Sequence, residues 1–243
     1  MGNGGMTDLV QSEGGISGAG STILTSYPYL VFSLSLFAIF LLLFTQARHQ
    51  RPLLVFSGLG SAAFSFSSYV FVPEYWDPVR VWSLVVGPED LVFSFANGGI
   101  VWSIASWRRL VLPGFERSGA IFAKRFFGWT LLGLASSAPP HFAGFSSMTC
   151  CFCAMAVVGC VALISRPDLL KFAIAGAVGF SCLYTVLGVA IMIALPDFST
   201  QWTHENLSGV DLLSLPIEET LWAFGFGAVF PLIVASSANV RLT

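Results

Sequence analysis

The fold of this chain is decided by an apolar segment that opens with two acids: PIEETLWAFGFGAVFPLIVAS, residues 216–236. Beyond Glu218 and Glu219 the segment has no charged side chain, and its length is close to the roughly 20 residues that a helix needs to cross a bilayer core. A second segment of this kind, PEDLVFSFANGGIVWSIASW, occupies residues 88–107. Because charged side chains are costly at membrane depth, the paired acids at the starts of two hydrophobic helices are the strongest indication of function in the sequence.

The composition of the whole chain is that of an integral membrane protein. Of its 243 residues, 55% are hydrophobic and only 10% are charged, and the mean hydropathy is +0.79, which is outside the range of ordinary soluble domains. Positive charge occurs only in short clusters, so we exclude nucleic acid as a partner. The five cysteines fall in apolar stretches without the spacing of a zinc site, which predicts buried, unpaired thiols and no metal centre.

Apolar stretches of suitable length predict an all-α fold with seven transmembrane helices. We expect residues 1–26 to be a flexible polar segment and residues 27–243 to form a single membrane domain. In the fourth span, Pro139 and Pro140 should kink or shorten the helix. The predicted spans are residues 29–45, 52–72, 88–107, 126–145, 147–165, 171–195 and 216–236.

The basic residues predict the orientation of the chain. With the N-terminus outside, 10 of the 11 lysines and arginines lie in inner loops or in the C-terminal tail, so the positive-inside rule favours an outside N-terminus and an inside C-terminus. We expect a multi-pass protein of the plasma membrane in a prokaryote, or of the endoplasmic reticulum or a similar membrane in a eukaryote. Arg80 alone falls outside, where we expect it to pair with Glu74 or Asp77. The residues assigned to the inner side are Arg48, Arg51, Arg108, Arg109, Arg117, Lys124, Arg125, Arg166, Lys171 and Arg241.

The two acidic segments are parts of an internal repeat. Upstream of them, VFVPEY at residues 70–75 resembles IALPDF at residues 193–198. Because both copies have the same orientation, we predict two parallel three-helix repeats, at about 27–108 and 147–238, which a linking helix at about 126–145 joins. Aligning Glu89 with Glu218 also pairs Asp90 with Glu219, Phe93 with Trp222, Phe95 with Phe224 and Gly98 with Gly227.

The repeated pattern is an acid, an aromatic ring one turn deeper and then a glycine. Acids at a helix start can simply offset the helix dipole. However, Phe93 follows Glu89 by one turn and Trp222 follows Glu218 by one turn, so each pair shares a helix face. A protonated carboxyl beside aromatic rings can deliver a proton to an alkene, the rings can stabilise the resulting cation, and a second carboxylate can remove a proton at the end.

This chemistry assigns roles to particular residues and requires no cofactor. We expect Glu218 and Glu89 to form the acid/base pair, with Glu219 and Asp90 as the next choice. His141 and Asn97 are possible accessory residues, although a polar cap at the membrane surface and a hydrogen bond between helices are the simpler roles. Glu74 is a third accessory candidate. The aromatic residues expected to contact substrate or cation are Phe93, Trp222, Trp76, Trp82, Phe95 and Phe224, and the outer loops also contain Tyr75, Phe198 and Trp202.

The segments Pro216–Glu219, Pro88–Phe93 and Pro73–Pro78 resemble the lycopene cyclase domain family, in its tandem two-repeat form. That family includes heterodimeric bacterial cyclases and the cyclase portion of fungal bifunctional phytoene synthases. The resemblance implies a cofactor-independent, proton-initiated closure of the ends of lycopene to β-ionone rings, without net redox change. It also implies a lipid-soluble polyprene substrate that arrives from the bilayer, and association with other carotenoid-pathway enzymes.

Two other functions fit the same residues. Related small fungal membrane cyclases close epoxidised meroterpenoids by similar acid chemistry, so the substrate could be another polyprenoid. A proton-coupled carrier would also use paired acids inside a membrane. A retinal protein is excluded, because the last span, residues 216–236, contains no lysine for a Schiff base.

Overall fold

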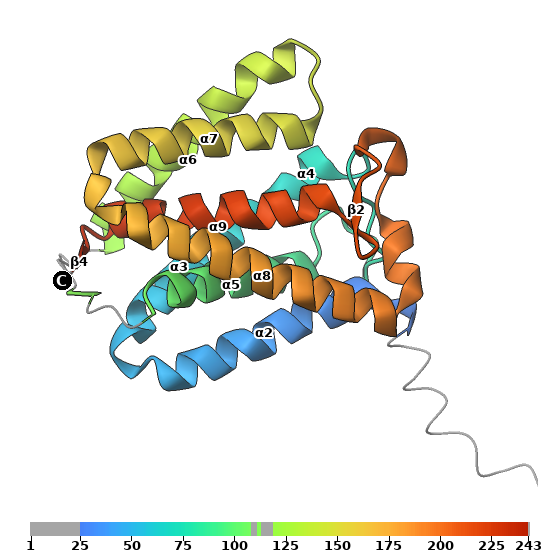
Figure 1. Ribbon diagram of the computed structural model, residues 1–243, viewed down its shortest axis with the longest axis horizontal. Helices are drawn as coiled ribbons and strands as arrows, with labels where there is room; N and C mark the ends of the chain where they lie inside the picture. The colour runs from blue at the N-terminus through green and yellow to red at the C-terminus, as the bar shows by residue number, and fades with distance from the viewer. Residues whose placement is uncertain (1–24, 108–110, 113–118, 243) are drawn as a thin grey trace, which may run out of the picture.

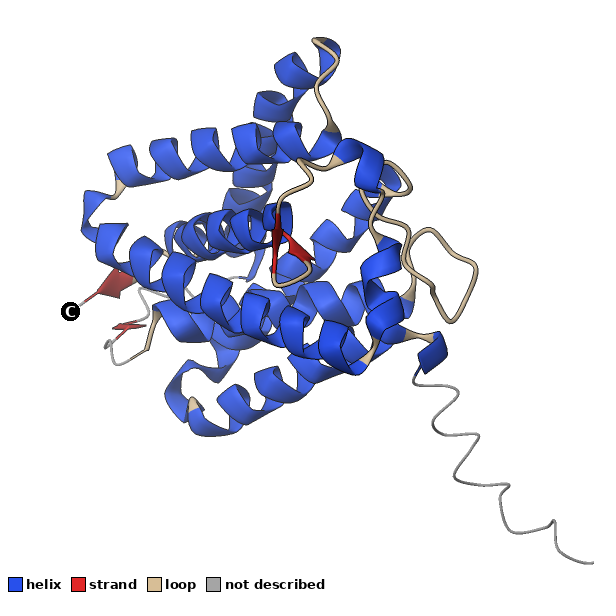
Figure 2. Cartoon of the chain, turned by 45° about the vertical axis from the view of Figure 1, so that its right-hand side comes forward, coloured by secondary structure: helices blue, strands red, loops and turns tan. Residues whose placement is uncertain are grey.

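The computed structural model describes residues 25–107, 111–112 and 119–242, and it is nearly all helix (Figure 2). Each predicted span corresponds to a helical segment, although the second is divided into three consecutive parts. The predicted flexible segment 1–26 lies outside the described residues except for its last two, as do Arg108, Arg109 and Arg117. The helices are α2 (Pro28–Gln46), α3 (Arg51–Ala62), η2 (Ala63–Ser67), α4 (Ser68–Phe71), α5 (Pro88–Ala105), α6 (Gly119–Phe142), α7 (Ser147–Ser165), α8 (Leu170–Ala194) and α9 (Ile217–Ser237). Short 3-10 helices are η1 (Arg48–Gln50), η3 (Pro167–Leu169), η4 (Pro196–Gln201) and η5 (His204–Asn206).

Five helical segments of the described chain are long and apolar enough to cross a membrane. This finding indicates a multi-pass membrane protein. Helices α5 and α6 fall short of the same apolarity; α5 begins with Glu89 and Asp90, and α6 carries Lys124 and Arg125. Seven crossings and the outside N-terminus therefore stay predictions. The five segments are Pro28–Gln46, Arg48–Phe71, Ser147–Ser165, Pro167–Ala194 and Ile217–Ser237.

Helix α6 differs in extent from the fourth predicted span. It begins at Gly119, seven residues before the predicted start at 126, and it continues through Pro139 and Pro140 to Phe142. Proline lacks an N–H but keeps its carbonyl, and both proline carbonyls accept backbone hydrogen bonds from the residues that follow the helix. The helix ends two residues after the prolines, three residues before the predicted end of the span.

The packing of the helices is similar in the two predicted repeats. Helix α5 packs along α2 and α3, and α9 packs along α7 and α8 in the corresponding way. The two central helices also contact each other, and α5 packs against α8 (Figure 1). Helix α6 lies against α7 and α9. The helices that carry the two acidic pairs therefore form the centre of the bundle.

Glycines allow the closest of these helix contacts. A Cβ atom on Gly98 would lie 2.6 Å from the carbonyl oxygen of Ser57 in α3. A Cβ on Gly227 would lie 2.5 Å from the carbonyl oxygen of Gly176 in α8. Real side chains do not approach this closely, so the prediction that Gly98 and Gly227 permit close helix packing is confirmed.

The two outer loops, residues 72–87 and 195–216, pair with each other at one end of the bundle. Trp76 and Trp202 form an isolated antiparallel bridge. The amide of Asp77 donates to the carbonyl of Gln201 at 2.7 Å, and the amide of Thr203 donates to the carbonyl of Tyr75 at 3.0 Å. The loops that lead into α5 and α9 are thus joined directly above the starts of those helices.

Four two-residue strands modify the all-α prediction. Strands β2 (Asp211–Leu212) and β3 (Leu215–Pro216) form a hairpin that leads straight into α9. Its two turn residues, Leu213 and Ser214, have positive φ values, as a tight type I′ turn requires. At the opposite end of the bundle, β1 (Val111–Leu112) pairs with β4 (Arg241–Leu242) (Figure 1).

The five cysteines are free, as predicted. Cys150 is buried, but Cys160 in α7 and Cys182 in α8 are exposed, so the prediction that all of them are buried is wrong. On a helix that faces lipid, an apolar stretch needs no protein neighbour, because the bilayer itself is an apolar solvent.

Candidate active site

A cavity lies among the outer ends of the helices, beneath the paired loops. Its empty space, including the part that is open to the outside, is about 650 Å³. Two carboxyl groups, those of Asp90 and Glu219, line it together with a largely aromatic wall. The aromatic lining residues are Tyr29, Phe32, Phe64, Phe71, Tyr75, Trp76, Phe93, Tyr184, Phe198, Trp202 and Trp222.

The acidic pairs occupy equivalent positions at the starts of α5 and α9. Glu89 and Glu218 are each the second residue of their helix, and Asp90 and Glu219 are each the third, so the alignment made from the sequence holds in the structure. Successive residues of a helix point about 100° apart, so the two acids of a pair cannot face the same space. In both helices the third residue lines the cavity and the second does not.

Glu89 and Glu218, the residues expected to act first, instead bind the loops that precede their helices. Glu89 Oε1 accepts a hydrogen bond from the backbone amide of Val81 at 2.9 Å. Glu218 Oε1 accepts one from the backbone amide of Ser208 at 2.6 Å. Each of these carboxylates thus fixes the outer loop of its own repeat.

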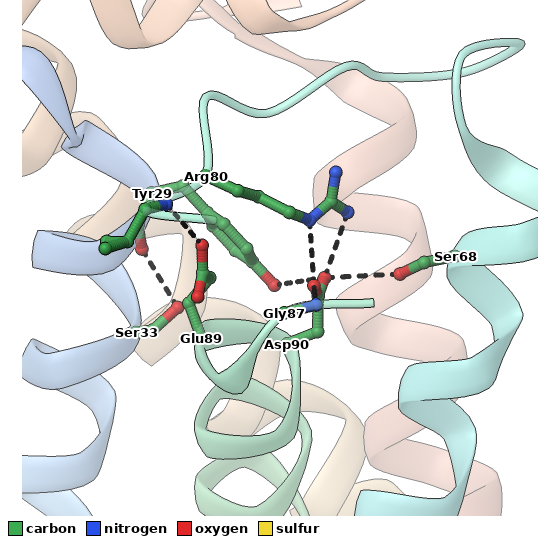
Figure 3. A network of polar contacts seen from close by, with 8 residues as sticks. Tyr29, Ser33, Ser68, Arg80, Gly87, Glu89 and Asp90 are labelled. Atoms are coloured by element: carbon green, nitrogen blue, oxygen red, sulfur yellow. Dashed lines mark hydrogen bonds and ion pairs between the residues drawn. The ribbon is translucent and has the colours of Figure 1, made fainter. Parts of the chain in front are cut away.

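Asp90 accepts hydrogen bonds from four residues, one of which, Arg80, also forms an ion pair with it (Figure 3). Arg80 Nε lies 2.9 Å from Oδ2, and both side chains are almost fully buried. The amide of Gly87 donates to Oδ2 at 2.7 Å, while the hydroxyls of Tyr29 and Ser68 donate to Oδ1 at 3.1 and 3.2 Å. Asp90 is therefore a buried carboxylate with a cation and a full set of hydrogen bonds.

This pairing corrects the expectation that Arg80 binds Glu74 or Asp77. The outer loop folds back over the start of α5, which brings the guanidinium to the third residue of that helix. Glu74 lies elsewhere, where its Oε1 accepts a hydrogen bond from the amide of Ser147 at 2.9 Å. Ser147 is the first residue of α7, so Glu74 stabilises that helix start.

Glu219 is buried among neutral donors. Its Oε1 accepts hydrogen bonds from the Tyr75 hydroxyl at 2.9 Å and from the Trp202 indole N–H at 3.0 Å. Its Oε2 accepts one from the Tyr184 hydroxyl at 2.7 Å. No lysine or arginine of the described chain forms a salt bridge with Glu219. Burial, and next the carboxyl of Glu219, raise the pKa of the Tyr75 phenol far above its ordinary value, so this hydroxyl stays protonated and keeps donating.

Three of the predicted aromatic residues line the cavity: Phe93, Trp222 and Trp76. Phe93 and Trp222, which the repeat aligns, stack on each other with ring centroids 6.1 Å apart and an interplanar angle of 24°. Trp76 contacts the ring of Tyr29 edge to face at 4.5 Å. The aligned rings of the two repeats thus meet below the two carboxyls.

Phe95, Phe224 and Trp82 do not line the cavity. Phe95 and Phe224 each come two residues after an aromatic residue that does, which places them on nearly the opposite helix face. Phe95 packs edge to face on Phe40 of α2 at 5.0 Å, and Phe224 is half exposed. Trp82 is exposed on the outer loop.

The remaining accessory candidates also lie away from the cavity. His141 is exposed near the end of α6. Asn97 is buried in α5, and neither its side-chain nitrogen nor its oxygen has a hydrogen-bond partner. The expected hydrogen bond between Asn97 and another helix is therefore absent. Among the described residues, no group of three or more His, Cys, Asp or Glu side chains could hold a metal ion.

Several residues of the site were not predicted from the sequence. Tyr29 and Tyr184 lie within predicted apolar spans, and the acidic motif gives them no role. The signal that could have found them is the phenolic hydroxyl, because a buried tyrosine usually needs a hydrogen-bond partner. Arg80 was recognised as the one outer cation, but its partner was misassigned.

Residues 146–235 match a family model described as lycopene cyclase. This part of the chain is similar to the lycopene cyclase family. A search of curated proteins and a search of solved structures found no match. The matched segment contains Tyr184, Trp202, Glu219 and Trp222, which line the cavity. The opposite wall, with Asp90, comes from residues that precede the matched segment. The match supports a carotenoid cyclase function and the membrane location that the apolar helices indicate.

Proposed function

We propose that the protein is an intramembrane lycopene β-cyclase, which closes the ends of lycopene to β-ionone rings by proton-initiated chemistry without net redox change. The observation that carries this proposal is the pair of carboxyls in one aromatic cavity. Glu219 has only neutral hydrogen-bond donors, whereas Asp90 has a cation. The match of residues 146–235 to the lycopene cyclase family supports the class of reaction.

Glu219 is the proton donor in this proposal, in preference to Glu218. Trp202 can only donate, so with Tyr75 it fixes Oε1 as an acceptor. The hydroxyl of Tyr184 can donate or accept, so Oε2 can carry a proton beside it. Protonating Glu219 breaks no ion pair. Glu218 is less suitable, because it does not line the cavity.

Each ring closure begins with one proton transfer and finishes with another. The O–H bond at Glu219 Oε2 breaks, and its proton forms a C–H bond at the inner CH carbon of the terminal alkene, which leaves a tertiary cation on the outer, dimethyl carbon. A neighbouring double bond supplies the electron pair of the new ring C–C bond, which leaves a carbocation in the ring. Asp90 then takes a proton from the adjacent carbon, and that C–H electron pair becomes the ring double bond. Transfer of a proton from Asp90 back to Glu219 restores the site, so the sum is an isomerisation.

The aromatic wall contributes by stabilising the intermediate. The rings of Phe93 and Trp222 line the same cavity as both carboxyls, and a ring face attracts positive charge. The attraction is strongest where water is excluded, and Tyr75 and Trp202 close the cavity from above with 4% of their surface exposed. The ring carbocation is therefore held between π faces and the carboxylate of Asp90.

The substrate would reach this cavity from the bilayer, because a C40 hydrocarbon is insoluble in water. Phe64 and Ser67 of η2 and Met148 of α7 form one side of the cavity. Phe66, between the two η2 residues, is 61% exposed, which suits a surface that faces lipid. We expect lycopene to enter between η2 and the start of α7.

Expression in lycopene-producing cells, followed by pigment analysis, tests the proposal. The natural chain should convert lycopene to cyclic carotenoids, and Glu219→Gln should abolish conversion while the protein stays inserted in the membrane. Glu205→Gln is the matched control, because Glu205 is exposed in η5, and it should retain full activity. Unchanged lycopene in cells that contain the folded natural chain would reject this substrate.

One observation favours a second substrate, an epoxidised polyprenoid. Ser67 and Ser94 line the cavity, and no hydrogen bond joins either hydroxyl to another described residue. Free hydroxyls could bind an oxygen atom on the end of the substrate, which lycopene lacks. Incubation of purified protein with lycopene and, separately, with an epoxidised polyprene would show which one is cyclised.

A further inference from the structure

The two carboxyls of the cavity have different side-chain nitrogen donors. The outer loop before α5 supplies the guanidinium of Arg80 to Asp90, and the outer loop before α9 supplies the indole of Trp202 to Glu219. The two donors come from corresponding loops and reach the third residue of corresponding helices. One of them carries a full positive charge and the other carries none.

Arg80 binds Asp90 through two nitrogens. Its Nε lies 2.9 Å from Oδ2 and its Nη2 lies 3.2 Å from Oδ1, so the planar fork meets both carboxylate oxygens. The two side chains are 6% and 3% exposed. In such a dry position a carboxylate without a cation would take up a proton rather than remain charged.

We propose that Arg80 is a positioning residue that decides which carboxyl of the cavity holds the proton: it keeps Asp90 as the anion and leaves Glu219 as the protonated group. This assignment rests on the proposed cyclisation, in which Glu219 starts the reaction and Asp90 ends it. Without Arg80 the two equivalent carboxyls would compete for protons, and a site with both of them protonated has no base.

Arg80 is suited to this role because every other titratable group around the two carboxyls is a phenol or an acid. Helix α4 and the segment η2 contribute serines but no charge to this part of the cavity. Arg80 is thus the only cation of the described chain that contacts the site. The other groups are Tyr29 from α2, Tyr75 from an outer loop, Tyr184 from α8, and Glu89 and Glu218 beside the two carboxyls.

Infrared spectroscopy of the purified protein tests the assignment without relying on activity. A protonated carboxyl has a carbonyl stretching band that shifts in D2O. At neutral pH, and with Glu89→Gln in every protein compared to remove the other buried acid that has no cation, we expect one such band from a buried group, which Glu219→Gln removes and Asp90→Asn leaves. Arg80→Gln should add a second band, which the double variant Arg80→Gln/Asp90→Asn should lack. Loss of the original band in Asp90→Asn, or no new band in Arg80→Gln, would overturn the proposal.

Two matched variants separate this role from a general effect of charge or of folding. Arg166→Gln removes an arginine from an exposed ion pair with Asp168 and should leave the spectrum unchanged. Arg80→Lys keeps the charge and should show a single band, like the natural chain. If Arg80→Gln alone fails to fold, Arg80→Lys and the double variant still test the assignment, because a second band in either one contradicts it.

The pH profile of cyclisation gives a second readout. In Arg80→Gln, Asp90 loses its cation, so the rate at neutral pH should fall about tenfold or more and the size of the loss should vary with pH. Arg80→Lys should retain the profile of the natural chain. An equal loss at every pH would indicate a merely structural role for Arg80 and would refute the proposal. If the natural chain itself converts no polyprene, the cyclisation is rejected, while the infrared result still decides the protonation of the two carboxyls.

Discussion

At the scale of single residues, the site depends on which face of a helix each side chain occupies. Glu219 and Trp222 are three residues apart on α9 and both line the cavity, whereas Glu218 and Phe224 do not. Residues three or four apart share a helix face, while neighbours and residues two apart do not. The acid and the ring of α9 that line the cavity are therefore Glu219 and Trp222, one residue closer in sequence than the pair that the motif suggested.

Trp222 should matter for the rate because of its ring face, more than because of its bulk. Trp222→Leu should lower the rate of cyclisation about 30-fold, which corresponds to the loss of roughly 2 kcal/mol of cation–π attraction in a desolvated site. Trp222→Phe keeps a ring face, so its rate of cyclisation should fall much less. The measurement is the initial rate of product formation in isolated membranes, corrected for the amount of protein.

Phe224→Leu is the matched control for this experiment. Phe224 lies two residues further along α9, is 48% exposed and does not line the cavity, so its replacement should leave the rate unchanged. An equal loss in Trp222→Leu and Phe224→Leu would show that the effect comes from altered packing rather than from the cavity.

The sequence predicted the helices that carry the acids, but it did not predict which acid faces the cavity. The rotation of α5 and α9 about their axes is set by packing against neighbouring helices, above all at Gly98 and Gly227. Tyr184 reaches Glu219 from 35 positions earlier in the chain, and Tyr29 reaches Asp90 from 61 positions away. Such contacts depend on how distant parts of the chain pack together, and short sequence motifs do not predict that packing.

At the scale of the elements, close contact between α8 and α9 depends on two facing glycines. The Cβ of an alanine at position 227 would meet the carbonyl oxygen of Gly176 at 2.5 Å, and that oxygen is backbone and cannot turn aside. Gly227→Ala should destabilise the protein by about 1–3 kcal/mol, the usual cost of overpacking. Thermal unfolding in detergent, followed by circular dichroism, measures the change.

Gly128→Ala provides the comparison for Gly227→Ala. Gly128 lies in α6, and a Cβ there would meet no atom within 4 Å. Alanine is also the better helix former, so Gly128→Ala should leave stability unchanged or raise it slightly. Similar midpoint temperatures of thermal unfolding for the two variants would contradict the close-packing role of Gly227.

Hydropathy predicted where each helix lies, but not how the second one is built. The span from Arg51 to Phe71 changes to a 3-10 helix over Ala63–Ser67 before it ends. A serine hydroxyl can bond to nearby backbone carbonyls, as Ser65 does with Ala62 at 2.7 Å, and such local bonds compete with regular helix. A hydropathy average does not detect this change. The 3-10 segment nevertheless contributes Phe64 and Ser67 to the wall of the cavity.

At the scale of the whole molecule, the predicted orientation can be tested with single cysteines. Trp82 is exposed on an outer loop, and Lys124 is exposed near the start of α6. In a variant that lacks the native cysteines, Trp82→Cys should react with a membrane-impermeant maleimide in intact cells, because the predicted topology places it outside. Lys124→Cys should react only after the cells are opened, and the reverse pattern would overturn the orientation.

The repeat predicted how the two halves are built, but not how they meet. Similar packing of α5 on α3 and of α9 on α8 follows from similar sequences. The stacking of Phe93 on Trp222 and the pairing of the outer loops join the two halves, so they depend on both sequences at once. Arg80 and Trp202 then show that corresponding loops supply different donors.

The bridge between Trp76 and Trp202 bears on the purity of the product. A tertiary carbocation that meets water is captured as an alcohol, and this capture competes with loss of a proton. Because the joined loops cover the cavity at the end that the predicted topology places on the aqueous side, while substrate would arrive from lipid, the loops would restrict the access of water to the cation. The pairing of two loops would thus determine whether the enzyme releases a pure hydrocarbon or a mixture that contains hydroxylated rings.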